Sequence, residues 1–282
     1  MSDSVEAGKV VITGAGGGIG LGLAQEFARR GFDVVALLRD ATKRTEFDKA
    51  LAGLEDRVEV QQLDVRNAAD YRMPQDVSIL VNNAGIRYEY LPVEEIPMAE
   101  WREYFEVNFF GVVELCRLAI PPMRQAGRGI ICNINSSSLF YPMPFLAPYR
   151  ATKGAMAALT ESLRAELAPF GIRVTEIFPG PVASALSAGG ILHRTPAAAN
   201  YPPYAPLAHS QRAAQQSADL PIYQPSDVAP AMVDHILGST GVMRDGTCDM
   251  SRAALENWRT GTGGEPLMNA FITSMMSRVK NA

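Results

Sequence analysis

The feature that most constrains the fold is a short apolar run that ends in a glycine-rich turn near the N-terminus. The segment Val10–Gly22 reads VVITGAGGGIGLG, with Gly14, Gly18 and Gly20 after the apolar run. This order predicts a buried strand that turns on glycine into a helix beginning near Gly18, and glycine lets the main chain approach a diphosphate closely. The pattern therefore indicates a dinucleotide-binding turn. The alternative is a turn that only packs the strand against the helix.

The glycines are spaced Gly-x-x-x-Gly-x-Gly, and no Gly-Lys-Ser/Thr follows them, which disfavours a P-loop nucleotide triphosphatase. From Lys9 to Phe178, short apolar runs alternate with helical patterns. This alternation predicts a Rossmann-type α/β fold, a doubly wound parallel sheet that binds ligands beyond the carboxyl ends of its strands. The expected strands are Val10–Thr13, Val34–Leu38, Val58–Leu63, Ile79–Asn82, Ile130–Ile134 and Val174–Phe178, and the expected longer helices are Ile19–Arg30, Trp101–Gln125 and Ala151–Ala168.

Residues 1–282 are expected to form a single domain with three parts. Residues 9–184 would form the core that binds the cofactor and carries the catalytic residues. Residues 185–225 are rich in Pro, Ala, Tyr and Gln, which predicts a substrate lid made of either a long loop or a few short helices. Residues 226–282 would form a C-terminal helix and an extended tail, either docked on the body through apolar residues or frayed.

Composition excludes several classes of protein. A net charge of -4 offers no broad attraction to nucleic acid. No apolar stretch approaches the ~18 residues that span a membrane, and the N-terminus lacks a signal-peptide pattern, so a cytoplasmic location is expected. Cys116, Cys132 and Cys248 are odd in number and unpatterned, which predicts buried thiols without disulfides. The histidines have no spacing suited to a metal, so no metal site is expected.

Three residues suggest proton-transfer chemistry. Tyr149 and Lys153 stand four apart at the start of a predicted helix, so their side chains share one face. An ammonium near a phenol favours the phenolate, the form that accepts a proton. Such a pair alone is common on solvated helix faces. Ser136, however, lies just past the strand Ile130–Ile134, where its hydroxyl can hydrogen-bond a substrate oxygen.

Taken in order, these motifs resemble the classical short-chain dehydrogenase/reductase family from Lys9 to Ser184. The resemblance rests on Thr13-Gly14-x-x-x-Gly18-Ile19-Gly20, Asn82-Asn83-Ala84-Gly85, Asn108, Ser136, Tyr149-x-x-x-Lys153 and the turn Pro179-Gly180. It implies an oxidoreductase that interconverts a secondary alcohol and a ketone by hydride transfer, working as a homodimer or homotetramer. A non-redox lyase or epimerase on the same fold, and a regulatory protein that senses NADP(H), are the alternatives.

The resemblance also implies roles for the catalytic residues. Tyr149 would be the general acid/base, Lys153 would favour its phenolate and hold the nicotinamide ribose, and Asn108 would anchor a water. Ser136 would polarise the carbonyl. Because Ser137 and Ser138 follow directly, it stays open which of the three hydroxyls polarises the carbonyl. The spacing to Tyr149 favours Ser136, with the other two as backbone caps.

The end of the second expected strand bears on the cofactor. Leu38 stands where an NAD-binding protein would place an acid, and Arg39 follows, which favours NADP(H) over NAD(H) because arginine can pair with a 2′-phosphate. Arg39 as a mere surface residue, and Asp40 as a displaced acid, are the alternatives, while Lys43 and Arg44 add positive potential nearby. The expected cofactor-binding residues are Gly14, Gly16, Gly17, Gly18, Ile19, Gly20, Arg39, Asp64, Val65, Asn82, Ala84, Gly85, Tyr149, Lys153, Pro179, Gly180, Val182 and Ser184.

The segment Leu139–Phe145 borders the reaction centre because it lies between Ser136 and Tyr149, and it is apolar and aromatic. It suggests a small-molecule substrate that is a bulky hydrophobic or aromatic alcohol or ketone, unless its side chains simply pack the rim. Arg87 either meets a substrate carboxylate or is an exposed arginine without that role. The expected substrate contacts are Ser136, Ser138, Tyr141, Phe145 and Tyr149, with Tyr201, Tyr204 and Leu207 from the lid.

Overall fold

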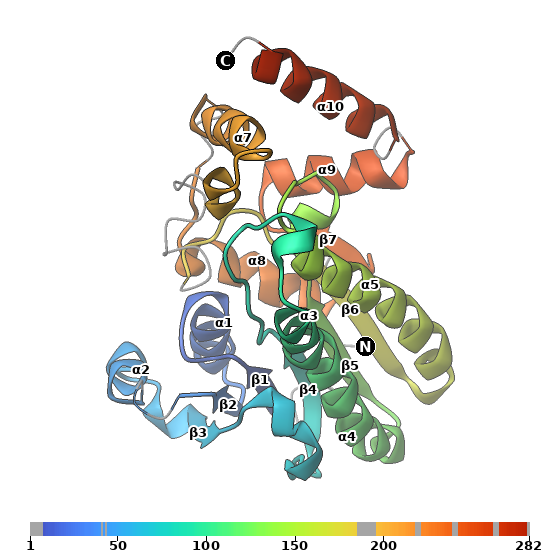
Figure 1. The fold of residues 1–282 in the computed structure, drawn as a ribbon. Helices are drawn as coiled ribbons and strands as arrows, with labels where there is room; N and C mark the ends of the chain where they lie inside the picture. Colours follow the sequence, from blue (N-terminus) through green and yellow to red (C-terminus); the bar gives the residue numbers. More distant parts are fainter. Residues whose placement is uncertain are drawn as a thin grey trace.

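The architecture is a single seven-stranded parallel sheet with helices on both faces (Figure 1). It is seen in a computed structural model that describes residues 8–40, 42, 44–184, 196–217, 221–238, 242–261 and 265–280. The strands run in the order β3-β2-β1-β4-β5-β6-β7, so the direction of winding reverses between β1 and β4. This reversal places a crevice at the carboxyl ends of β1 and β4, where doubly wound sheets bind ligands.

All six expected strands are present, and the doubly wound parallel fold is confirmed. Their bounds are β1 Lys9–Thr13, β2 Val34–Leu38, β3 Val58–Gln62, β4 Val77–Asn82, β5 Gly129–Ile134 and β6 Ile172–Phe178, with a short β7 at Arg244–Gly246. The strand β7 pairs in parallel with β6, with Glu176 opposite Arg244.

The helices differ from the expected ones at two places that concern the site. They are α1 Gly18–Arg29, α2 Arg44–Ala50, α3 Met98–Phe105, α4 Gly111–Ala126, α5 Ala147–Leu167, α7 Ala205–Ser217, α8 Pro225–Leu237, α9 Asp249–Arg259 and α10 Glu265–Lys280. Helix α5 begins four residues before the expected start because Pro148 is tolerated in a first turn, where its missing N–H is not needed. The expected helix Trp101–Gln125 is α3 and α4 joined by a π-helical turn at Glu106–Phe110.

Two apolar layers bury the sheet. Val10 and Ile12 of β1 point to the face covered by α1 and α8, whereas Val11 points to the face covered by α3, α4 and α5 (Figure 1). Successive side chains of a strand point to opposite faces, so a strand that is covered on both faces is apolar throughout. This burial fixes the strand ends from which the site is built.

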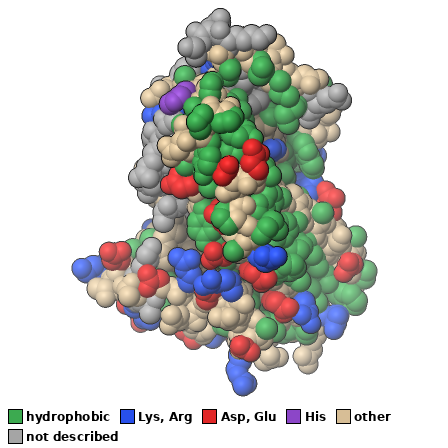
Figure 2. Space-filling view, viewed as in Figure 1, with side chains coloured by type: hydrophobic (Ala, Val, Ile, Leu, Met, Phe, Trp, Pro, Cys, Tyr) green, Lys and Arg blue, Asp and Glu red, His purple; other side chains and the backbone are tan. Residues whose placement is uncertain are grey.

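The region after β6 contains short helices, as one of the two expectations for it proposed. A 3₁₀ turn at Ala197–Asn200 precedes α7, while residues 185–195 and 218–220 of the expected lid lie outside the described residues. Helix α10 contacts α7, and α7, α9 and α10 lie together at the top of Figure 1. In Figure 2 the upper part of the same view is largely hydrophobic, and the charged side chains gather in the lower part. Within the described ranges, no helix has the length and apolarity needed to cross a bilayer.

Candidate active site

The turn between β1 and α1 is closed by contacts that only glycine permits. Gly14 has φ +64°, and a Cβ atom on it would lie 2.8 Å from Ala84 Cα in the loop after β4. Gly18 has φ +54°, and its Cβ would lie 2.6 Å from Ser184 Cβ. A side chain at either position would therefore strain the backbone and clash. Three chain segments meet at this turn, which leaves a cradle of bare main chain.

The same turn presents donors to an anion. Gly17 precedes α1 without a side-chain cap, and the first turn of α1 carries no acidic residue. Gly16, Gly18 and Ile19 are half-buried there, and Gly20 is buried against Gly14. Unpaired N–H groups and the positive end of the helix favour a phosphate group at this place.

The loop after β4 is hydrogen-bonded to the glycine turn. Asn83 Nδ2 donates to Thr13 O at 2.9 Å and to Gly14 O at 3.2 Å, and Thr13 Oγ1 accepts from Asn83 N and Ala84 N at 2.9 Å each. Asn82 lies deeper, where its Nδ2 donates to Asn133 Oδ1 at 2.9 Å. Sequence reasoning assigned Asn82 to the cofactor, whereas it used Thr13 and Asn83 only as parts of the family motifs and gave them no role. Their signal was available, because both stand at the carboxyl ends of neighbouring strands.

Charged residues follow β2 and β3. Arg39 is exposed, and Asp64 caps the turn after β3, where hydrogen bonds from Arg66 hold the pKa of Asp64 below its ordinary value. Val65 packs against Gly111 at the start of α4. Asp40 accepts hydrogen bonds from Thr42 N and Oγ1 at 2.9 and 2.6 Å, so its carboxylate serves a local turn. Arg44 pairs with Asp48 at 2.7 Å, and Lys43 lies outside the described residues.

Tyr149 and Lys153 lie together in α5, as their spacing predicts. Both are buried, and Lys153 Nζ lies 5.6 Å from the centroid of the Tyr149 ring. Nζ donates to Ile134 O at the end of β5 at 2.8 Å. Burial lowers the pKa of Lys153, while Tyr149 acts in the opposite direction. The pair can pass a proton and present a cation beside the phenol.

Ser136 follows β5 and is half-buried. Its Oγ lies 2.9 Å from Ser138 Oγ and accepts from Ser138 N at 3.2 Å, so Ser136 caps the 3₁₀ turn Ser137–Leu139. The expectation that Ser137 and Ser138 are the backbone caps is wrong, because the oxygen that the turn needs belongs to the residue preceding it. Ser138 is buried, and its carbonyl accepts from Arg150 Nε at 3.0 Å.

Asn108 lies in the π-helical turn between α3 and α4 and is buried. Its Oδ1 accepts from Ile86 N at 2.8 Å, and its Nδ2 donates to Ile86 O at 3.1 Å and to Thr152 Oγ1 at 3.3 Å. These bonds fix the segment after Gly85 against α5. A π-helical turn inside a long helix frequently marks a functional site.

The segment after β6 runs from the Ser136 turn to the glycine turn. Pro179 O accepts from Ser137 N at 3.1 Å, and Gly180 N donates to Thr247 Oγ1 at 3.1 Å. Val182 forms a bridge with Tyr223, and Ser184 lies against Gly18. The segment therefore borders the crevice along its length.

The aromatic loop before α5, residues 139–145, packs against two different apolar clusters. Phe145 is buried in the cluster that contains Tyr149, and its ring packs edge-on against Tyr204 at 6.0 Å. It is the one non-glycine residue in the described ranges with a positive φ, of 66°. Tyr141 instead packs near α9, and its hydroxyl donates to Met250 O at 3.2 Å. The positive φ of Phe145 is a backbone strain that often accompanies a functional site.

Arg87 is half-buried, so the expectation of an exposed arginine is wrong. Its guanidinium carbon lies 5.9 Å from the centroid of the Tyr149 ring and 6.0 Å from that of Tyr90. The Tyr90 hydroxyl is buried and has no hydrogen-bond partner in the described part of the chain. Sequence reasoning missed Tyr90, since nothing local distinguishes it from a core tyrosine.

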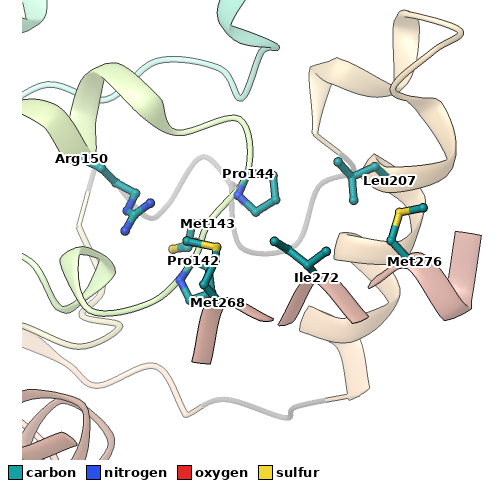
Figure 3. A pocket seen from close by; sticks show the side chains of 8 residues that line it. All are labelled: Pro142, Met143, Pro144, Arg150, Leu207, Met268, Ile272 and Met276. Atoms are coloured by element: carbon teal, nitrogen blue, oxygen red, sulfur yellow. The ribbon is translucent and has the colours of Figure 1, made fainter. Parts of the chain in front are cut away.

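An apolar cavity of about 320 Å³ opens beyond the loop that precedes α5 (Figure 3). Its lining comes from the loop before α5, from the first turn of α5, from α7 and from α10, and Arg150 of α5 is its one charged side chain. The lining residues are Pro142, Met143, Pro144, Arg150, Leu207, Met268, Ile272 and Met276. The three α10 residues recur every four positions, so they share one face of the helix. Across the described residues, no group of three His, Cys, Asp or Glu side chains is arranged to hold a metal, and the three cysteines are buried and free.

Known proteins resemble this chain in sequence. A family model described as short chain dehydrogenase matches residues 8–190, more than half of the chain. The 11-beta-hydroxysteroid dehydrogenase A of Sesamum indicum is 36% identical over 197 residues, which cover 67% of this chain and 56% of the sesame protein.

Solved structures agree. A short-chain dehydrogenase from Streptomyces avermitilis aligns with a TM-score of 0.73 and 27% identity, over 100% of this chain and 99% of that one. A short chain dehydrogenase from Burkholderia cenocepacia in complex with NADP aligns with a TM-score of 0.66 and 25% identity, over 90% and 93% of the two chains. The chain therefore belongs to the short-chain dehydrogenase/reductase family.

Proposed function

We propose that the protein is an NADP(H)-dependent oxidoreductase of the cytoplasm that interconverts a secondary alcohol and a ketone. The observation that carries this proposal is the burial of Tyr149 and Lys153 on one face of α5, beside Ser136 at the end of β5. The bare main chain at Gly14 and Gly18 fits a dinucleotide, because a Cβ at either position would enter the cradle. When bound there, the nicotinamide supplies or accepts the hydride.

The chain's own residues handle the oxygen and its proton. In the reducing direction, the Tyr149 hydroxyl donates its proton to the carbonyl oxygen, so that no free alkoxide persists. Ser136 Oγ donates a hydrogen bond to the same oxygen and holds it in place. Lys153 stabilises the phenolate that remains and holds the ribose, and Asn108 orders the segment after Gly85 and anchors the water that returns the proton.

Arg39 carries the proposed preference for NADP(H). Its exposure at the end of β2 leaves the guanidinium free to reach a 2′-phosphate, and an acid at this position would repel that group. The local hydrogen bonds of Asp40 to Thr42 argue against Asp40 as a displaced ribose ligand. The NADP complex of the Burkholderia relative is a precedent within the family.

The substrate class that fits best is a bulky hydrophobic or aromatic alcohol or ketone. Phe145, Tyr90 and Tyr204 present aromatic surface around Tyr149, and the cavity beyond is lined almost entirely by apolar side chains. The sesame relative is named for a hydroxysteroid, which is an alcohol of this kind. We also propose that the chain forms a homodimer or homotetramer. Light scattering measures the molar mass that tests this.

The test follows nicotinamide absorbance at 340 nm during turnover. Purified protein is mixed with NADPH or NADH and a panel of apolar aromatic and alicyclic ketones, chosen after mass spectrometry of whatever copurifies. NADPH consumption matched by alcohol formation supports the proposal. Substrate conversion with constant absorbance would indicate a lyase or epimerase instead, and NADPH binding without conversion of any ketone would favour a sensor.

A further inference from the structure

A buried carboxylate lies behind the candidate catalytic residues. Glu176 of β6 is fully buried, and its Oε1 accepts from Asn135 Nδ2 at 2.6 Å. Its Oε2 accepts from Arg244 Nε of β7 at 2.8 Å. Acidic side chains are almost never fully buried unless they are paired, and burying a pair gains little stability over an apolar core. Packing alone therefore gives no reason for an acid at this position.

Asn135 connects that carboxylate to the site on two sides. The amide Nδ2 that donates to Glu176 also donates to the main-chain oxygen of Lys153 at 3.1 Å. The amide Oδ1 accepts from Ser136 N at 2.8 Å. One buried side chain therefore fixes the start of the Ser136 turn relative to α5. Because Glu176 accepts one N–H of the amide, it also sets which way the amide faces.

The same carboxylate lies one side chain away from Lys153. The Asn135 amide that it accepts from also bonds the Lys153 main chain, and Lys153 Nζ donates to Ile134 O, next to Asn135. Burial lowers the pKa of Lys153, and both Tyr149 and Glu176 oppose that change. Burial likewise raises the pKa of Glu176, which Asn135, Arg244 and Lys153 oppose. The two buried groups therefore stabilise each other's charged forms.

The remaining charged and titratable groups around the carboxylate lie on α5, β5 and β7. Arg244 pairs with Glu161 at 2.8 Å as well as with Glu176, and its guanidinium carbon lies 5.2 Å from the centroid of the Trp258 ring. Cys132 of β5 is fully buried, and burial raises the pKa of its thiol well above the ordinary value, so it stays neutral. Arg244 is thus paired with both Glu176 and Glu161, so the two carboxylates can be removed separately.

We propose that Glu176 and Asn135 are positioning residues for the reaction: Glu176 keeps Lys153 in its ammonium form, and Asn135 holds Ser136 in register with α5. Neither touches Tyr149 or the substrate position in the described contacts, so both act through other residues. The kinetic part of this inference rests on the proposed function, whereas the effect of Glu176 on the lysine does not.

The first experiment measures the lysine directly, without turnover. The chain has five lysines, so a protein labelled with 13C-lysine gives a short set of Cε signals, and Lys153→Arg identifies the Lys153 signal by its loss. Glu176→Gln is expected to lower the titration midpoint of that signal by about one pH unit, because an opposite charge nearby shifts a pKa by ~1–3 units. Glu161→Gln removes the other acid from Arg244 and is expected to leave the midpoint unchanged.

The second experiment measures pH–rate profiles of kcat/KM. Glu176→Gln is expected to move the alkaline limb to lower pH by the same amount, whereas a purely structural role would scale the rate at every pH and leave the limb in place. Asn135→Ala removes the bonds to Ser136 N, Lys153 O and Glu176 and is expected to lower kcat about tenfold, with the Lys153 midpoint nearly unchanged. A wild-type kcat in Asn135→Ala would remove that residue from the proposal.

A fold control completes the test. If Glu176→Gln leaves Arg244 too poorly paired to fold, Glu176→Gln with Arg244→Met removes both charges together, which buried pairs tolerate better than the loss of one partner. The lysine midpoint is still expected to fall. A midpoint equal to that of the wild type in whichever variant folds overturns the role of Glu176. If the wild type turns over no ketone, the proposed function fails, and the lysine titration still decides this inference.

Discussion

The two halves of the sheet are buried in different ways. On the β1–β2 side, Val10–Ile12 and Val34–Leu38 are aliphatic and almost fully buried on both faces. On the β4–β6 side, buried polar residues interrupt the strands near their carboxyl ends: Asn82, Asn133, Asn135, Thr175 and Glu176. The first half turns a bare backbone toward a phosphate, and Thr13 at the end of β1 is the one buried polar side chain of β1 and β2. The second half has to hold polar side chains in fixed places inside the protein.

A chain of hydrogen bonds across three elements holds the polar half together, while Asn82 Oδ1 is buried without a hydrogen-bond partner in the described part of the chain. Asn82 Nδ2 of β4 donates to Asn133 Oδ1 of β5, and Asn133 Nδ2 donates to Thr160 Oγ1 of α5, both at 2.9 Å. Leaving one such buried group without a partner costs about 1–3 kcal/mol. This network therefore fixes the relative positions of β4, β5 and α5, on which the placement of Tyr149 depends.

The largest expected effect tests whether the polar half carries the chemistry. Tyr149→Phe is expected to lower kcat by ~10²–10⁴-fold, because the ring still packs but the transferable proton is gone. The dissociation constant of NADPH, measured by fluorescence titration, is expected to stay within about twofold of the wild type. Retention of more than about a tenth of the wild-type rate would exclude Tyr149 as the general acid.

The two halves also differ in how far the sequence predicts them. The apolar strands, the glycine turn and the spacing of Tyr149 and Lys153 are local patterns, so they were predicted correctly. Glu176 stands in the strand Val174–Phe178, and its partners Asn135 and Arg244 are 41 and 68 residues away. Such a pairing exists only after the sheet has ordered its strands.

The Ser136 turn was misread for a different reason. Three consecutive serines offer three equivalent hydroxyls, and only the backbone path decides which oxygen caps the turn. The path of the chain also buries Arg87 partly, although its local sequence resembles that of a solvated arginine. Both cases needed the three-dimensional course of a loop.

The second prediction tests the glycine half. Gly14→Ala is expected to weaken NADPH binding by more than tenfold and to lower the melting temperature, because its φ is positive and its Cβ would meet Ala84 Cα at 2.8 Å. Gly31→Ala is the matched control, since Gly31 follows α1 away from this turn and has a positive φ of 88°, but an added Cβ there meets no atom within 4 Å. Calorimetric titration and thermal unfolding measure both. Equal losses in the two variants would indicate that flexibility, and not the close approach, is what Gly14 provides.

A smaller effect concerns the selectivity for NADPH over NADH, which depends on Arg39 after β2. NADPH is expected to bind at least tenfold more tightly than NADH, and Arg39→Ala is expected to remove about 1.4 kcal/mol of that difference, the value of one tenfold change. Arg44→Ala removes a nearby arginine that is already paired with Asp48, so it is expected to leave the ratio unchanged. Equal affinities for both cofactors in the wild type would contradict the role given to Arg39.

The smallest expected effect lies beyond both halves, in the cavity beneath α10. Ile272 lines this cavity and is 49% exposed, so Ile272→Ala removes apolar contact without opening the core. The KM for a bulky apolar ketone is expected to rise about threefold to tenfold, in line with ~0.8 kcal/mol per buried methylene, while kcat stays unchanged because contact remote from the reacting atoms is lost equally in ground and transition states. Phe170→Ala, an exposed apolar residue just after α5, is the matched control and should leave KM unchanged. A small ketone that cannot reach the cavity should show no difference between the wild type and Ile272→Ala. Equal KM changes for the large and small ketones would mean that α10 acts on the stability of the site, and that the cavity does not hold the substrate.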